Sequence, residues 1–171
     1  MTPKPVSASV TIMTELVLPN HANTLGNLLG GQLMHWIDIC AAMAAARHNQ
    51  RTCVTASVDR IDFHHPIHVG DVVTLVASVN RVFRSSMEVG VKVFVENLKT
   101  REVKHTSSAY LTFVAIDKEG NRVPIPPVVP ESEDEKRRFE DAGAGVLAGL
   151  VLRVDVLQLP RDGFRALACL F

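Results

Sequence analysis

The sequence predicts an α+β fold in which a five-stranded antiparallel sheet wraps around one long buried helix. Residues 33–46 are apolar on almost every side of a helix, with a single carboxylate, Asp38, near the middle. Residues 53–117 hold four long runs that are rich in β-formers or alternate with a period of two. A helix that is apolar all round needs a curved sheet, because a flat one would leave half of it in water.

Local patterns justify the first half of the fold. Val10–Leu18 is rich in β-formers and is expected to form the first strand, which Pro19 ends. Gly26, Gly30 and Gly31 precede the helix. Glycines there allow a sharp turn and bring backbone N–H groups close to a ligand.

From Cys53 onward the apolar residues recur with a period of two. Val54, Ala56 and Val58 share one face, and the apolar residues that follow fall out of phase, which predicts a bulge near residues 59–60. Further strands are expected over residues 72–83, 87–96 and 104–117. The four strands could pair in order as an antiparallel meander, with open edges that favour pairing between two subunits.

The C-terminal part is expected to add one short helix. Ser132 and Glu135 have the spacing of a capping box, which predicts a short, highly charged helix over residues 133–140. The structured domain is expected over residues 8–141. Residues 142–171 form a tail of unpredicted structure, in which Arg153 and Asp155 interrupt the apolar run and argue against a membrane span.

Composition excludes some classes of protein. The 171 residues suit one domain, and Lys+Arg balances Asp+Glu at 18 each, so no basic face for nucleic acid is expected. Three cysteines form no C-x-x-C pair, which favours reduced thiols. The first residues lack the apolar stretch of a signal peptide. The expected location is the cytoplasm.

Several polar residues are candidates for a site. Asp38 in an apolar helix is either kept for chemistry or paired with a buried cation. Asn23 could take part in the site or only shape its turn, and Asn27 is the second candidate amide. Gly30 and Gly31 could also serve only close packing of the helix. His64, His65 and His68 have no acidic or cysteine partner nearby, so a surface turn is expected and no metal.

Four segments of the chain form a recognisable set: PNHANTLGNLLGGQLMHWID, TASVDRIDFHHPIHVGD, RSSMEVGVKVFVEN and PVVPESEDEKRRFE. They resemble the hotdog acyl-CoA thioesterases, which include cytosolic acyl-CoA hydrolases of animals and bacterial short-to-medium-chain relatives. They stand in the family's order and the resemblance covers about residues 8–141. It implies the hotdog fold and hydrolysis of fatty acyl-CoA to a free fatty acid and coenzyme A, without a cofactor.

The resemblance also implies the residues of the site. It makes Asp38 the catalytic acid, completed by Asn23, which lies fifteen residues earlier. The family implies that the two come from facing subunits, so a homodimer or a trimer of dimers is expected. Whether Asp38 acts as general base or as nucleophile stays open.

Physical chemistry suggests the remaining groups. Backbone N–H groups near Gly31 and Gln32 at the helix start would face a developing oxyanion. Arg84, Ser85 and Ser86, at a turn between strands, are candidates to bind the anionic end of coenzyme A.

Two rival functions are considered. A hotdog acyl dehydratase or hydratase pairs a histidine with an acid, and His21 is the only candidate ahead of the helix. A non-catalytic acyl-CoA-binding module would use the same pocket without cleavage. Release of free thiol from acyl-CoA distinguishes a hydrolase from the binding module, and formation of an enoyl chromophore from a 3-hydroxyacyl substrate would indicate the dehydratase.

Overall fold

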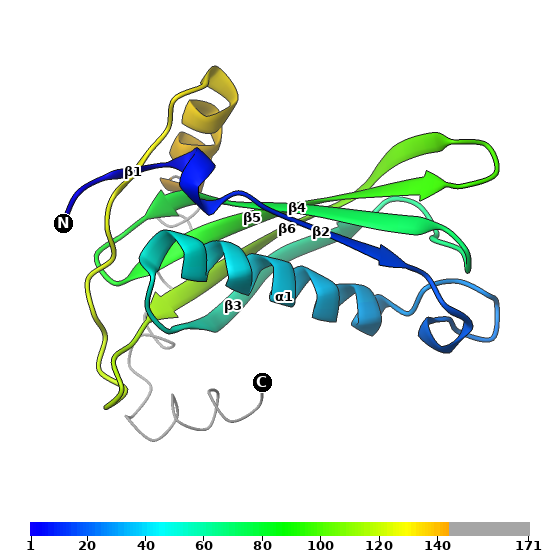
Figure 1. The fold of residues 1–171 in the computed structure, drawn as a ribbon, viewed down its shortest axis with the longest axis horizontal. Helices are drawn as coiled ribbons and strands as arrows, with labels where there is room; N and C mark the ends of the chain where they lie inside the picture. The colour runs from blue at the N-terminus through cyan, green and yellow to red at the C-terminus, as the bar shows by residue number, and fades with distance from the viewer. Residues whose placement is uncertain (144–171) are drawn as a thin grey trace.

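The computed structural model describes residues 1–143, except the side chains at positions 60, 62 and 63. One long helix lies against one face of a curved five-stranded sheet (Figure 1). No helix in this described range is long and apolar enough to cross a membrane. The tail expected over residues 142–171 lies, from residue 144 on, outside the described residues.

The elements follow one another in a simple order. A short N-terminal arm precedes the first long strand, and the long helix comes before the other four long strands. The elements are β1 (Lys4–Pro5), η1 (Val6–Ser9), β2 (Thr11–Leu16), η2 (Pro19–His21), α1 (Gly30–Asn49), β3 (Cys53–Phe63), β4 (Val72–Val82), β5 (Ser86–Asn97), β6 (Glu102–Ala115) and β7 (Val128–Val129). Residues 133–143 are also helical.

The strand order of the sheet is β2-β4-β5-β6-β3. The predicted meander of four strands in sequence order is therefore wrong in part, because β3 pairs with β6 and not with β4. Residues 64–71 carry the chain across the end of the sheet to β4, which pairs with β2. A period of two identifies a strand but not its neighbour. As a result β2 and β3 are the two edges within this chain.

The bulge predicted in β3 is confirmed. The pairing of β3 with β6 shifts register between positions 58 and 60, as expected from the change of phase. A second shift, between Thr55 and Ser57, was not predicted. It reverses the faces of the residues on its two sides, which matters for the site below.

The core lies between α1 and the concave face of the sheet. Small side chains of α1, among them Ala41 and Ala44, are completely buried and let the helix approach the strands closely. Leu75 and Phe113 fill the sheet side of this contact. Burial raises the pKa of Cys40 to about 11, so its thiol stays protonated and packs as a small hydrophobic group.

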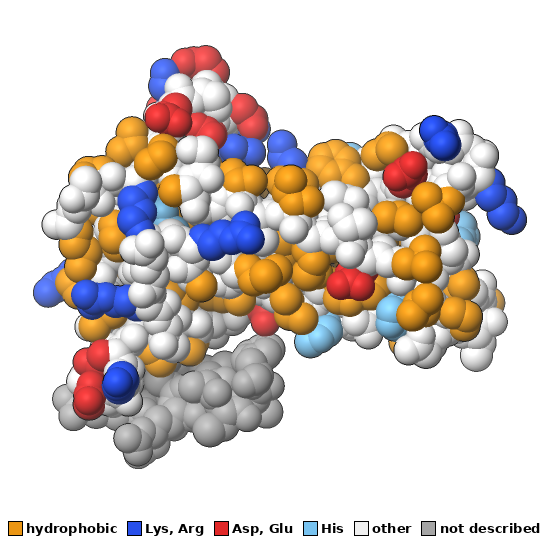
Figure 2. All heavy atoms as spheres, viewed as in Figure 1, with side chains coloured by type: hydrophobic (Ala, Val, Ile, Leu, Met, Phe, Trp, Pro, Cys, Tyr) orange, Lys and Arg blue, Asp and Glu red, His pale blue; other side chains and the backbone are white. Residues whose placement is uncertain are grey.

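The sheet covers only one face of α1. Met34 is 45% exposed and Ile39 is 37% exposed, and Asp38 is half-buried between them. The expectation of a helix buried on every side is therefore wrong for a single chain. Figure 2 shows hydrophobic side chains exposed on the face that carries α1 and β2, most densely toward the end where the helix begins. α1 is apolar all round because it has two apolar faces: one packs on the sheet, and the other is left uncovered in this chain.

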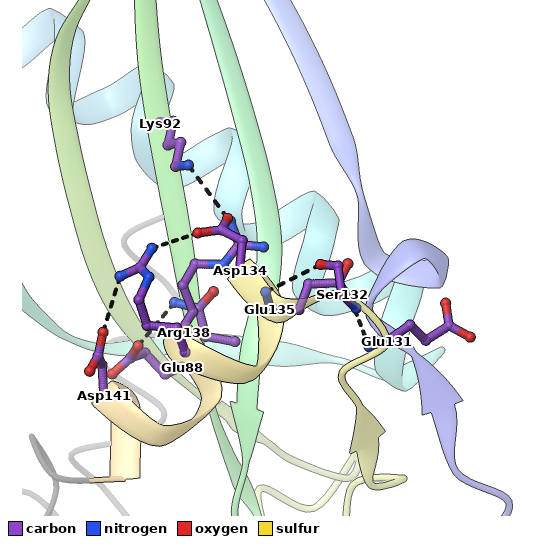
Figure 3. Close-up of polar contacts among 10 residues, drawn as sticks. Glu88, Lys92, Glu131, Ser132, Asp134, Glu135, Arg138 and Asp141 are labelled. Carbon is purple, nitrogen blue, oxygen red and sulfur yellow. Dashed lines mark hydrogen bonds and ion pairs between the residues drawn. The ribbon is translucent and has the colours of Figure 1, made fainter.

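The predicted C-terminal helix is confirmed, and it lies on the face of the sheet turned away from α1 (Figure 3). Its capping box is present: the Ser132 N–H donates to Glu135 Oε2 at 2.9 Å, and the Glu135 N–H donates to Ser132 Oγ at 3.3 Å. The guanidinium of Arg81 lies 4.4 Å from the Phe139 ring centroid and donates to the Phe139 carbonyl. The docking of this helix thus combines polar contacts with apolar packing by Phe139 and the buried Ala142.

The C-terminal end of α1 is fixed by the N-terminal arm and the segment before β7. Lys4 Nζ donates to the His48 carbonyl at 2.6 Å, and Arg47 Nη1 donates to the Val10 carbonyl at 2.7 Å. The fully buried His48 ring contacts the Pro126 carbonyl through Nε2 at 2.8 Å, while its Nδ1 has no partner. Burial lowers the pKa of His48, so the folded protein favours the neutral ring.

The free energy of unfolding should therefore decrease as the pH is lowered through the range in which free histidine gains a proton. The pKa of His48 is lower in the folded protein than in the unfolded chain, so the unfolded chain binds the extra proton at a higher pH. Stability is therefore lost as the pH drops below about 6.5, by at most about 1.4 kcal/mol per pH unit. His48→Gln can still donate to Pro126 but cannot titrate. Thermal unfolding from pH 7.5 to 5 should show a smaller loss of Tm in this variant. An equal loss in both proteins would contradict the assignment.

Candidate active site

Asp38 lies at the edge of the helix–sheet contact and is held by one strand. The hydroxyl of Thr55, on β3, donates to Asp38 Oδ1 at 2.7 Å. No cation pairs with Asp38 in the described range, so the alternative of a structural acid bound to a core arginine is not supported. The carboxylate thus has one neutral hydrogen-bond donor and remains half-buried, facing the uncovered side of α1.

Thr55 was missed from the sequence because of the face it occupies. Val54 and Ala56 suggested the apolar side of β3, yet they pack with Val114 and Ile116 in a separate small cluster. Thr55 pairs with Phe113, whose ring faces α1, so Thr55 points toward the helix. The signal that could have found it is a hydroxyl residue one position out of phase with the apolar run, just before a bulge.

Asn23 forms the centre of a tight loop. Its Oδ1 accepts the backbone N–H groups of Leu25 at 2.9 Å and Asn27 at 3.1 Å, and its own N–H donates to the Asn27 carbonyl. Gly26 closes the loop with a φ of +76°. The side-chain oxygen of Asn23 therefore does shape its turn, as one of the two expected roles required. The Asn23 amide group is exposed, and its nitrogen has no acceptor within residues 1–143, so it can still donate to a ligand.

One chain does not bring Asn23 and Asp38 together. The Asn23 loop lies ahead of Gly30, where α1 begins. Asp38 lies eight residues further along the helix, which is about 12 Å of axial rise. The loop is held at the helix start by the hydrogen bond from Leu29 N to the His21 carbonyl at 2.9 Å.

The first turn of α1 offers free donors beside a pocket. The Leu33 N–H bonds to the Leu29 carbonyl at 3.1 Å, but the N–H groups of Gly31 and Gln32 have no acceptor among the described residues. A Cβ at Gly31 would meet no atom within 4 Å, so close packing does not require this glycine. A pocket of about 400 Å³ lies beside this turn, lined by apolar Leu28, Leu33, Pro66 and Ile67 and by Asn27, Gly30, His64 and His65.

The predicted coenzyme-binding residues lie at the other end of the sheet. Arg84 and Ser85 lie in the turn between β4 and β5, and Ser86 begins β5; this turn is near the C-terminal end of α1, while the Asn23 loop lies near its start (Figure 1). Arg84 is exposed, and its carbonyl accepts the Ile125 N–H at 3.2 Å. The structure therefore joins Asp38 with Thr55 and leaves Asn23 and residues 84–86 apart.

The histidines near the site serve local structure. His21 Nδ1 accepts the Leu18 N–H at 3.2 Å, and its ring packs edge-on against Trp36. This leaves His21 as a brace for the loop and gives no support to a dehydratase histidine. In the described part of the chain, no group of three or more His, Cys, Asp or Glu residues could hold a metal ion.

Comparison with known proteins gives a consistent family. The family model of the thioesterase superfamily matches residues 25–102. A Bacillus subtilis protein named "Uncharacterized acyl-CoA thioester hydrolase YkhA" is 47% identical over 127 residues, which cover 74% of this chain and 74% of that protein.

Solved structures agree with the sequence match. The crystal structure of an apo-hexameric acyl-CoA thioesterase superimposes with a TM-score of 0.83 at 40% identity, covering 94% of this chain and 100% of that one. An acyl-CoA hydrolase from Staphylococcus aureus, solved with butyryl coenzyme A, coenzyme A and coenzyme A disulfide, has a TM-score of 0.83 at 35% identity and covers 91% and 94% of the two chains. Variants of that hydrolase with an aspartate, an asparagine or a threonine changed to alanine have also been solved.

A curved antiparallel sheet around one helix, together with these matches, defines a hotdog thioesterase. The chain belongs to the hotdog-fold acyl-CoA thioesterase family and is an enzyme of the thioester hydrolase class. The family and the fold predicted from the sequence are both confirmed.

Removing the hydroxyl of Thr55 should impair catalysis without unfolding the protein. Thr55→Val keeps the volume but leaves the Asp38 carboxylate without its 2.7 Å donor. Hydrogen bonds to charged groups contribute roughly 1.5–3 kcal/mol, so kcat for a short-chain acyl-CoA should fall about tenfold or more. Thr55→Ser keeps a hydroxyl and serves as the matched control, with activity close to wild type. Full activity in the valine variant would show that the contact has no catalytic role.

Proposed function

We propose that this chain hydrolyses acyl-CoA thioesters at a site shared by two subunits, with Asp38 of one subunit and Asn23 of the other as the central residues. The observation that carries the proposal is the half-buried Asp38, held by Thr55 on the uncovered side of α1. A lone carboxylate at that border is costly unless a substrate or a second chain meets it.

The related Staphylococcus aureus hydrolase supports the choice of residues. The asparagine, aspartate and threonine replaced in its solved variants are separated by 15 and 17 residues. Asn23, Asp38 and Thr55 have the same separations here. Three matching residue types at two matching separations support one functional set, and Thr55 becomes part of the proposed site.

The arrangement suits thioester chemistry in either of two ways. As a general base, Asp38 would take a proton from water while the oxygen adds to the thioester carbon. As a nucleophile, it would form an acyl anhydride that water then hydrolyses. In both cases the C–S bond breaks, the thiolate of coenzyme A leaves and gains a proton, and the acyl group ends as a carboxylate.

The start of α1 would stabilise the charge on the carbonyl oxygen. The free N–H groups of Gly31 and Gln32 lie at the positive end of the helix. The exposed Asn23 amide could donate to the same oxygen or to the water. The apolar pocket of about 400 Å³ beside this turn would receive the acyl chain.

A second subunit would supply what one chain lacks. β3 is an edge strand of 11 residues with one side unpaired in this chain, and the exposed stripe of α1 lies next to it. Pairing two such edges would extend the sheet and cover the stripe. Antiparallel pairing would bring the helix start of each subunit toward the helix middle of the other. A homodimer, or a trimer of such dimers, follows from this pairing, and one related thioesterase is hexameric.

The proposed location is the cytoplasm, and the proposed chemistry uses no metal. The two cysteines in the described part, Cys40 and Cys53, are free thiols, as expected in the cytoplasm. The hydrolysis outlined above uses only side chains, backbone groups and water, so no cofactor is proposed.

Arg84 should contribute to binding of the coenzyme. Arg84 is exposed in the turn between β4 and β5, and its guanidinium could meet a phosphate. Arg84→Ala should raise KM about fivefold at low salt, with little change in kcat, and the difference should shrink at high salt. Lys118→Ala, which removes an exposed cation at a different turn, is the control. An unchanged KM at low salt would exclude Arg84 as a phosphate ligand.

The shared site can be tested by mixing two inactive variants. Asn23→Ala and Asp38→Ala homodimers should each be folded and nearly inactive. A heterodimer isolated with two different tags has one site with both changes and one site with neither, so it should recover roughly half of the wild-type activity per dimer.

The same experiment separates the parts of the proposal. A folded but inactive heterodimer would place both residues in one subunit's site and reject the cross-subunit arrangement. An Asp38→Ala homodimer that keeps more than about a tenth of wild-type kcat would reject Asp38 as the catalytic acid, since only ~1.4 kcal/mol of barrier lowering would be lost.

A further inference from the structure

Asp71 is a buried carboxylate that the proposed chemistry does not use. It stands at the end of the connection 64–71, just before β4, and is 6% exposed. Its Oδ2 accepts the backbone N–H of His68 at 2.9 Å, and its Oδ1 accepts the side-chain amide of Asn97 at 3.2 Å. One oxygen of this acid therefore holds its own turn at His68, and the other holds the end of β5 at Asn97.

One side of Asp71 is attached to the sheet. Asn97 ends β5, and its Oδ1 accepts the N–H groups of Lys99 and Thr100, which shape the turn to β6. The backbone carbonyl of Asp71 accepts the Val17 N–H at 3.0 Å, just beyond the end of β2. Asp71 is thus fixed relative to the sheet by groups from two other segments.

The other side of Asp71 leads to the Asn23 loop. Asp71 closes a turn with His68, because the Asp71 N–H also donates to the His68 carbonyl at 3.0 Å. Gly70 makes this turn with a φ of +90°. The turn sets the path of residues 67–69, which lie beside the Asn23 loop.

Residues 67–69 pair with the loop through its backbone. The Leu28 N–H donates to the Ile67 carbonyl at 2.7 Å, and the Val69 N–H donates to the Gly26 carbonyl at 3.2 Å. Between these bonds, Asn27 forms a β-bridge with His68. Asn27 in turn exchanges two hydrogen bonds with Asn23, at 2.8 Å and 3.1 Å. A continuous set of hydrogen bonds therefore connects Asp71 to Asn23.

We infer that Asp71 is a positioning residue for Asn23, acting through residues 67–69, so that its carboxylate sets where the Asn23 amide meets the substrate. This inference rests on the proposed role of Asn23 in the function above. Reacting groups must be held within about 1 Å, and a displacement of that size costs roughly a hundredfold in rate. Among the described residues Asp71 has no cation partner, and its two directional hydrogen bonds suit it to fix a turn.

An exchange of side chains between positions 71 and 97 tests the inference. Asp71→Asn leaves one acceptor oxygen for two donors, so either the His68 N–H or the Asn97 amide loses its partner. Asn97→Asp places a second carboxylate against Asp71, so each single change breaks one hydrogen bond of the pair or of its turn. The double variant D71N/N97D restores one donor and one acceptor, and its new carboxylate can still accept from Lys99 and Thr100. We expect kcat to fall about tenfold or more in each single variant and to return to within about threefold of wild type in the double variant.

Hydrogen exchange of single amides by NMR gives a readout independent of activity. The Leu28 and Val69 amides should exchange faster in both single variants and recover in the double variant. The Val79 amide, which donates to Ser9 Oγ at 2.9 Å in the buried sheet, should not change. Asp117→Asn is the matched control, since Asp117 also accepts an asparagine amide, that of Asn121 at 3.1 Å, in a turn at the end of β6. It should leave kcat unchanged.

The outcomes distinguish the inference from the proposed function. A folded Asp71→Asn variant with kcat within about threefold of wild type would overturn it while leaving the hydrolase intact. Faster exchange at Val79 together with the loop amides would also overturn it, by showing a general loss of stability. If the wild-type protein failed to hydrolyse acyl-CoA, the proposed function would fail, while the exchange rates would still report whether Asp71 orders the loop.

Discussion

The contact between α1 and the concave face of the sheet is the constraint on which the site depends. Buried small residues, including Ala44 and Ala45, allow the helix to lie close to the strands. The sheet can cover only one face of a helix at that distance, so the opposite stripe stays exposed in one chain. Asp38 lies at the border between the two faces, where Thr55 can hold it and solvent can still reach it.

The fold separates the residues of the proposed site along the length of the helix. The Asn23 loop and the free N–H groups lie at the helix start, the acid lies at its middle, and residues 84–86 lie near its end. The uncovered stripe of α1 therefore matters both for packing against a second subunit and for assembling the proposed site. A second subunit that covered the stripe would bury apolar surface and bring the separated groups together in the same step.

The sequence was sufficient for features with strong local signals. The apolar helix, the long strands, the bulge after Val58 and the capping box at Ser132 were all predicted, because each depends on residues close together in the chain. The resemblance of four segments identified the family. The resemblance also implied Asp38 and Asn23 as site residues from facing subunits, an arrangement that a single chain does not contain and that stays a proposal.

Features that depend on distant pairing were not predicted. The position of β3 beside β6 follows from how residues 64–71 cross the end of the sheet, which no local period records. Thr55 was overlooked because an unpredicted register shift reversed the face of its strand. The role inferred for Asp71 was likewise hidden, since its partner Asn97 lies 26 residues away. Long-range register and side-chain pairing are therefore where the structure adds most.

The two ends of α1 differ in a way that affects the energetics of binding. At its C-terminal end, Arg47 and His48 are fixed by bonds to the N-terminal arm and to Pro126. At its first turn, the N–H groups of Gly31 and Gln32 have no acceptor within the described chain. A carbonyl oxygen that binds there displaces water without breaking any bond of the protein. The reorganisation energy of charge stabilisation is then small, because the donors are already oriented before the substrate arrives.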